Sequence, residues 1–289
     1  MEIVIFVLIA VLFGVVEGIT EWLPVSSTGH MILIEEWIDI NKLFPSEVPG
    51  YSESFWSFFL VVIQLGAILA VIIFFFNKLW PFSKDKTEEE RKDVFFIWLK
   101  TIIACLPAAI IGILFDDWLD EHLYNGFTVS ITLIFYGIFF IVLECFNKDK
   151  EDKVTSIKDL SFKYALIIGC IQLLALIPGT SRSGVTILGA MMLGCSREVS
   201  AEFSFYLSIP VMAGASLLKG LKFFLEFGMP NTSDLIFAII GFVVAFVVSL
   251  LCVKWLMDFV KKNDFKPFGI YRIALGLVLL GYFAVRLVI

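Results

Sequence analysis

The sequence predicts an all-α integral membrane protein with six transmembrane helices and two re-entrant helix-loop-helix segments, arranged as an inverted-topology repeat. The first observation is composition: 59% of the 289 residues are hydrophobic and the mean hydropathy is +0.93, whereas only about half of an ordinary soluble domain is apolar. The second is a series of long apolar runs with few charges. The third is a pair of polar loops, each preceded by an apolar run that is too short to cross a bilayer alone.

Six runs have the length and hydropathy that a helix needs to cross about 30 Å of hydrocarbon. One of them carries a single charge, Lys100, and the last carries Arg272 and Arg286 near its ends. The six expected spans are residues 55–76, 94–115, 127–143, 203–218, 235–253 and 268–289.

Two shorter apolar runs flank the polar loops. Residues 3–16 and 31–34 flank the first loop, and residues 164–178 and 185–193 flank the second. We expect each pair to dip into the membrane and return, with the polar backbone of the loop buried in protein or wetted by water. Residues 3–16 follow Glu2 rather than a basic leader, and no small-residue cleavage pattern comes after them, so a signal peptide is not expected.

The two halves of the chain resemble each other. A shift of 154 positions lays Pro178 on Pro24 and Ser181 on Ser27, and the apolar stretches that open with Phe59 and Phe203 also match weakly. We therefore expect one membrane domain over residues 1–289, built from repeats at about 1–146 and 160–289. Each half has one dip and three spans, and an odd number of crossings inverts the second copy.

Loop charges give the orientation. Residues 77–93, 147–163 and 254–266 are rich in Lys and Arg, whereas residues 116–126 are acidic and contain neither. The basic loops are expected in the cytoplasm and the acidic loop outside. The first dip then enters from the outer side and the second from the inner side.

The first polar loop carries the candidate catalytic groups. Glu17 and Glu21 are four residues apart, so on a helix they share one face that points toward the following turn. They are candidates for a base, an orienting group or metal ligands. The turn supplies possible nucleophiles, proton carriers and substrate contacts, namely Ser26, Ser27, Thr28 and His30.

The second polar loop has the composition of a phosphate cradle. Arg182 offers a planar fork of N–H donors that matches phosphate oxygens. Its neighbours add hydroxyl groups, small residues that permit close backbone approach, and a helix start: Gly179, Thr180, Ser181, Ser183 and Gly184. Together the two loops indicate phosphoryl transfer.

Structural roles compete with these functional ones. Ser26 and Thr180 are as well explained by hydrogen bonds to the backbone around a proline, and Glu21 with Arg182 could form a purely structural ion pair. Gly14 and Gly18 indicate close helix packing.

His122 is interpreted as a solvated surface residue. The five cysteines are interpreted as small apolar residues, because no pair has metal or redox spacing. The net charge of −6 lies in loops, and no basic motif indicates nucleic acid.

At these residues the sequence resembles the undecaprenyl-diphosphate phosphatase family, which is known for bacitracin resistance. The first signature of that family corresponds to Glu17, Glu21 and the segment from Leu23 to His30, and the second corresponds to the segment from Pro178 to Gly184. The resemblance implies removal of the terminal phosphate from undecaprenyl diphosphate at a site open to the outer face of the bacterial plasma (inner) membrane. It also implies a divalent cation, Mg²⁺ or Ca²⁺, at the acidic pair Glu17 and Glu21.

By the same resemblance, Ser27 and His30 would be the catalytic couple and Arg182 the phosphate clamp. The implied partners are the lipid substrate and the membrane lipid, without nucleic acid, and a homodimer is compatible with these features. A lipid-phosphate flippase or transporter is the competing function, because inverted repeats are as typical of transporters as of enzymes. Such a protein needs no nucleophile.

Two mechanisms share these residues. In one, Ser27 attacks phosphorus, His30 takes its proton and Glu21 orients the imidazole. In the other, His30 attacks and Ser27 only donates a hydrogen bond. We favour the first, because Ser27 aligns with Ser181 in the repeat while His30 lies one helical turn away, at a reach suited to a base. Attack by water held by Glu21 or a metal is the third route.

Overall fold

A computed structural model describes residues 3–148 and 150–288, without the side chains of residues 113, 116–121, 287 and 288. Over this part of the chain the fold is helical, and the only β-structure is an isolated bridge between Val154 and Cys195. The helices are α1 (Ile3–Thr20), α2 (Ser27–Glu35), α3 (Ile40–Leu43), α4 (Tyr51–Phe74), α5 (Phe76–Leu79), α6 (Glu88–Leu123), α7 (Gly126–Asn147), α8 (Phe162–Gln172), α9 (Arg182–Met192), α10 (Arg197–Phe227), α11 (Thr232–Val260) and α12 (Lys266–Val288), with 3-10 turns η1 (Ile157–Asp159) and η2 (Leu173–Leu176).

Seven of the described helices are long and apolar enough to cross a membrane: α1, α4, α6, α7, α10, α11 and α12. The chain is therefore a multi-pass, all-α membrane protein. The seventh candidate arises because α1 does not stop with the apolar run at residue 16 but continues through Glu17 to Thr20. The outer loop expected at 116–126 is also largely helical, since α6 continues to Leu123 and leaves a short connection to α7.

Small residues allow close contacts between helices. Gly137 on α7 and Gly269 on α12 face each other, and a Cβ atom on either would lie 2.7 Å from the carbonyl oxygen of the other. On α1, a Cβ at Gly14 would lie 2.7 Å from Gly241 O, and one at Gly18 would lie 2.8 Å from Val248 Cβ, both on α11. The interpretation of Gly14 and Gly18 as packing residues is confirmed. Close backbone approach of this kind is how helices associate in lipid.

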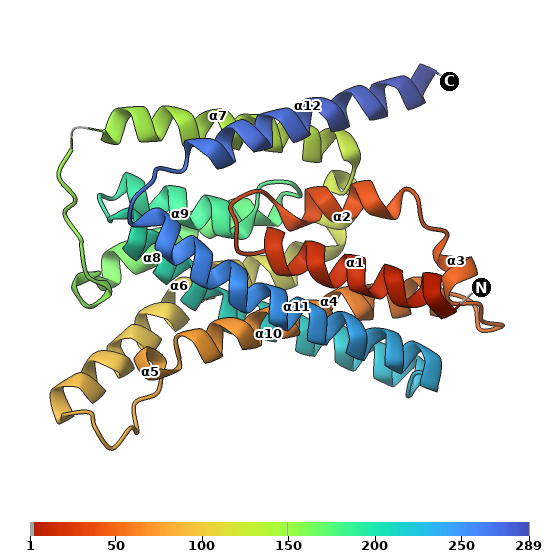
Figure 1. Cartoon of the computed structure of the whole chain (residues 1–289), viewed down its shortest axis with the longest axis horizontal. Helices are drawn as coiled ribbons and strands as arrows, with labels where there is room; N and C mark the ends of the chain where they lie inside the picture. The colour runs from red at the N-terminus through yellow and green to blue at the C-terminus, as the bar shows by residue number, and fades with distance from the viewer. Residues whose placement is uncertain (1–2, 149, 289) are drawn as a thin grey trace.

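Figure 1 shows α1 and α2 as a hairpin whose open end lies on the same side of the molecule as α3, while its turn lies midway along the long axis. Helices α8 and α9 form a second hairpin that enters from the opposite side. The two turns meet, because Ser183 Oγ at the start of α9 donates a hydrogen bond of 3.0 Å to Glu21 O at the end of the first hairpin. The polar loops thus come together in the interior of the helix bundle.

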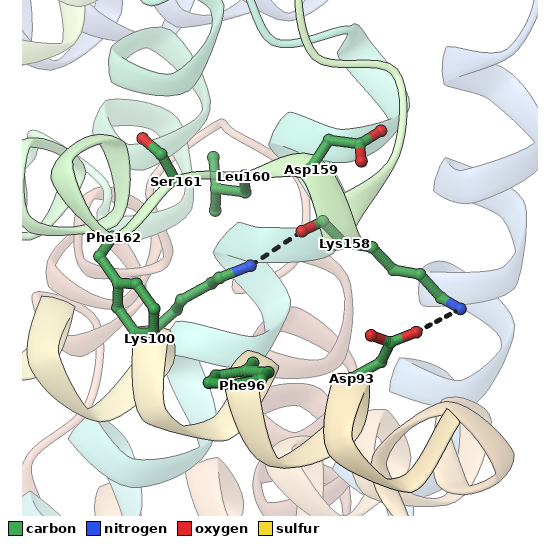
Figure 2. Close-up of a pocket in the computed structure, with 8 residues that line it drawn as sticks. All are labelled: Asp93, Phe96, Lys100, Lys158, Asp159, Leu160, Ser161 and Phe162. Carbon is green, nitrogen blue, oxygen red and sulfur yellow. Dashed lines mark hydrogen bonds and ion pairs between the residues drawn. The ribbon is translucent and has the colours of Figure 1, made fainter. Parts of the chain in front are cut away.

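Lys100, the single charged residue in the expected span 94–115, lies outside this polar centre and has partners of its own. Lys100 lines a cavity of about 390 Å³ between α6 and the segment from η1 to α8 (Figure 2). Its Nζ donates to Lys158 O at 2.9 Å, and the Lys158 side chain pairs with Asp93 at 2.7 Å. Lys100 therefore ties α6 to the loop that precedes α8.

Candidate active site

Two serine residues in an unusual backbone conformation open the helices of the site. Ser26 and Ser181 are the non-glycine residues of the described chain with positive φ, at 74° and 71°. Each caps a helix, since Ser26 Oγ accepts from Gly29 N at 3.3 Å and Ser181 Oγ accepts from Gly184 N at 3.1 Å. This conformation costs about 1–3 kcal/mol per residue and concentrates at functional sites.

These caps correct the alignment of the two polar loops. They place Ser26, not Ser27, opposite Ser181, because the first loop has one residue fewer between its proline and its cap. Arg182 then occupies in α9 the position that Ser27 occupies in α2. The alignment on prolines was wrong by one residue, so the argument that favoured Ser27 because it matches Ser181 does not hold. The two loops present different chemistry at the residue after the capping serine, a hydroxyl in one and a guanidinium in the other.

Glu21 lies at the centre of the site and joins both halves. Ser27 Oγ donates to its Oε2 at 2.9 Å, and Arg182 Nη2 donates to its Oε1 at 2.8 Å. Arg182 Nη1 donates to Ser204 O on α10 at 2.7 Å, which fixes the guanidinium. The Glu21 carboxylate is buried and its charge is balanced by Arg182. A serine hydroxyl held by a charged carboxylate has the geometry of an activated nucleophile.

The hydrogen-bond partners of His30 differ from the expected one, Glu21. Its Nδ1 is 2.7 Å from Ser26 O and its Nε2 is 2.6 Å from the hydroxyl of Tyr271 on α12. Glu21 binds Ser27 itself, so it does not orient the imidazole, and that part of the expected mechanism is wrong for this structure.

Glu17 lies one helical turn before Glu21 and is 2% exposed. Its Oε1 has no hydrogen-bond partner among the described residues. A buried carboxylate oxygen without a partner is costly, and carboxylate oxygens are what Mg²⁺ and Ca²⁺ bind. The chemistry of Glu17 therefore fits a divalent cation. Across the described residues, however, no cluster of three or more His, Cys, Asp or Glu side chains is placed to hold a metal.

The residues expected to contact substrate fall into two groups. Thr28, Ser181, Ser27 and His30 are partly exposed, and 12% of the Arg182 side chain is exposed, so ligand atoms can reach them. The others are buried and have structural partners or neighbours: Ser26 caps α2, Ser183 bridges the loops, Thr180 is fully enclosed, and Gly179 lies against Thr132 on α7. The backbone-bonding interpretation is confirmed for Ser26 but not for Thr180, whose buried hydroxyl makes no backbone hydrogen bond among the described residues.

Sequence reasoning missed Arg272, which is fully buried on α12. It donates to Pro24 O at 3.1 Å in the first loop, and to Gly179 O and Thr180 O, both at 2.9 Å, in the second. The signal was present, because an arginine within an apolar span is costly and marks an interior role. Tyr271 gave no comparable signal.

Comparison with known proteins identifies the family. The family described as Bacitracin resistance protein BacA matches residues 10–278, a range that includes both polar loops and Arg272. The chain belongs to the BacA family. A relative named Undecaprenyl-diphosphatase in Acetivibrio thermocellus is 55% identical over 278 residues, which is 96% of this chain and 98% of the relative.

Two further relatives agree. The Undecaprenyl-diphosphatase of Enterococcus faecalis is 54% identical, covering 94% of this chain and 96% of its own length. Undecaprenyl-diphosphatase 1 of Clostridium acetobutylicum is 51% identical, covering 96% and 98%. The resemblance stated from the two loop motifs is confirmed.

Proposed function

We propose that this chain hydrolyses undecaprenyl diphosphate to undecaprenyl phosphate and inorganic phosphate, which recycles a lipid carrier for cell-wall synthesis. The names of its relatives support the reaction and substrate. The observation that carries the proposal is the contact between Ser27 Oγ and Glu21 Oε2, with Arg182 on the other carboxylate oxygen. A flippase would have no need of a hydroxyl held in this way.

The chemistry follows from these contacts. Ser27 Oγ gives its proton to Glu21 and bonds to the terminal phosphorus, while the bridging P–O bond breaks and undecaprenyl phosphate leaves. Water then attacks the phosphoserine, which releases phosphate and restores the hydroxyl. Arg182 and the N-termini of α2 and α9 face the phosphate oxygens and stabilise their negative charge. In the structure the Nη atoms of Arg182 also bind Glu21, Ser204 O and Met212 Sδ, and its Nε is buried without a partner among the described groups, so the guanidinium would exchange one of these partners for a phosphate oxygen.

We propose Glu17 and Glu21 as the protein ligands of the divalent cation, Mg²⁺ or Ca²⁺. Because the described site supplies too few acidic or imidazole groups for a complete shell, the remaining ligands would be diphosphate oxygens and water. The ion would neutralise charge on the diphosphate. This arrangement gives the unpartnered Glu17 oxygen a role.

We propose that the chain lies in the bacterial plasma (inner) membrane with α1–α2 and α8–α9 as the re-entrant segments of an inverted repeat. Three features support this proposal: the hairpins enter from opposite sides, α1 packs on α11 while α8 packs on α6, and the caps Ser26 and Ser181 match in conformation. The isoprenoid tail can then remain in hydrocarbon while the head group enters the polar centre.

Phosphate release by the purified protein tests the function. The wild type is expected to release phosphate from C55 diphosphate, and less or none with a chelator, whereas Ser27→Ala should lose at least about 10²-fold in rate. Acid quench should trap a phosphoserine, which survives acid, while phosphohistidine does not. No phosphate release by the wild type, or full activity in Ser27→Ala, would contradict the proposal, and an acid-labile phosphoenzyme that vanishes in His30→Ala would assign the attack to His30.

A further inference from the structure

Tyr271 touches the site from outside both polar loops. It lies on α12 beside Arg272, and its hydroxyl is 2.6 Å from His30 Nε2. The two rings are parallel within 5°, with centroids 5.6 Å apart. The tyrosine side chain is 46% exposed, so it stands at the rim of the site, whereas Arg272 is fully buried.

The direction of these hydrogen bonds follows from donor chemistry. Ser26 O is a carbonyl oxygen and only accepts, so the proton in the 2.7 Å contact is on His30 Nδ1. Among the described residues the His30 ring pairs with no carboxylate that would hold a second proton on it, so we take the imidazole as neutral, with one N–H and a lone pair on Nε2. Tyr271 therefore donates its O–H to Nε2. The only basic nitrogen of His30 is held by the phenol rather than by Ser27.

We propose that Tyr271 is a positioning residue that fixes His30 as the neutral, Nδ1-protonated tautomer and keeps its Nε2 at the rim of the site. A donor on Nε2 stabilises the lone pair there and opposes both the other tautomer and a flipped ring. Because the phenol is half-exposed, it is able to turn away when substrate or the hydrolytic water needs the same nitrogen. The catalytic part of this inference rests on the proposed function, whereas the tautomer does not.

Nitrogen-15 NMR of the histidines tests the tautomer without any activity measurement. The chain has two histidines, so a His122→Gln background leaves His30 as the only labelled imidazole. We expect a protonated Nδ1 and an unprotonated, hydrogen-bonded Nε2, and in Tyr271→Phe we expect the Nε2 resonance to move toward that of a free imidazole. Tyr282→Phe, on the same helix, is the matched control and should leave the spectrum unchanged. A protonated Nε2 in the parent protein, or a Tyr271→Phe spectrum that superimposes on it, would overturn the inference.

Kinetics test the consequence for the reaction. Tyr271→Phe keeps the ring and removes only the hydroxyl, so kcat on C55 diphosphate should fall about tenfold, the effect of one hydrogen bond, with KM within about twofold. Tyr282→Phe should match the parent in both constants. A changed spectrum with an unchanged kcat would overturn the positioning role. If the parent protein released no phosphate at all, the proposed function would fail while the tautomer result would still stand.

Discussion

The Arg182 guanidinium forms hydrogen bonds to two partners, and a substitution at this residue tests whether both are needed. Its guanidinium binds Glu21 and Ser204 O simultaneously, and in the proposed reaction it also binds the diphosphate. A lysine has a single ammonium on a flexible stem and cannot reproduce this fork. We expect Arg182→Lys to lose about 10²-fold or more in kcat/KM. Arg286→Lys, at the exposed pair with Glu36, is the control, and an Arg182→Lys enzyme within twofold of wild type would rule out the clamp.

Some residues of the site could be predicted from the sequence and others could not. Glu17, Glu21 and Arg182 were identified because ionisable groups in an apolar chain are costly and rarely idle, and the structure brings them together. The partner of Glu21 was not predictable, because Ser27 and His30 both lie within one helical turn and only the folded loop decides between them. Tyr271 was not predictable either, since an aromatic residue on an apolar helix looks the same at a site as at a lipid surface.

At the scale of elements, α12 holds the two loops in contact through one side chain. Arg272 donates to carbonyl oxygens of both loops and is completely enclosed. Arg272→Met would leave buried carbonyl groups without partners, at about 1–3 kcal/mol each. We expect it to lose phosphatase activity and to unfold several degrees lower in a thermal scan in detergent.

The matched control is Arg286→Met, which removes an exposed arginine from the same helix and should unfold near the wild-type temperature. If Arg272→Met unfolds at the wild-type temperature with full activity, Arg272 does not hold the loops. Arg272→Lys, which keeps one donor, should be intermediate.

Element boundaries were less predictable than element types. Over the described residues the six long apolar runs lie in helices, apart from a break at Phe75, because hydropathy reports burial in lipid directly. The ends of these helices do not coincide with the ends of the apolar runs. Helix α1 continues past its apolar run to Thr20, whose hydroxyl donates to Val16 O. Helix α6 continues through an acidic segment to Leu123. The match between the two polar loops shifted by one residue, since Ser26 and Ser181 share a positive φ and each cap a helix, whereas the prolines lie at different distances before them.

The orientation of the whole molecule gives the last prediction. Figure 1 places α5, the connection before α8 and the connection from α11 to α12 at one end of the molecule, and these are the segments rich in Lys and Arg. Segment α3 and the open end of the first hairpin lie at the other end. The positive-inside rule puts the basic end in the cytoplasm, so the first hairpin opens outward.

Cysteine labelling in whole cells checks this orientation. The five native cysteines are replaced first, because Cys145 and Cys170 are exposed. Single cysteines then go to Lys153, in the basic connection, and to Glu47, an exposed position between α3 and α4. Glu47 is preferred to Asp120, whose side chain lies outside the described residues. With an impermeant maleimide we expect Glu47→Cys to react in intact cells and Lys153→Cys to react only after permeabilisation, with both variants still releasing phosphate. Reaction of both from outside would contradict the inverted repeat, because three spans, α4, α6 and α7, separate the two positions, and an odd number of crossings places them on opposite sides of the membrane.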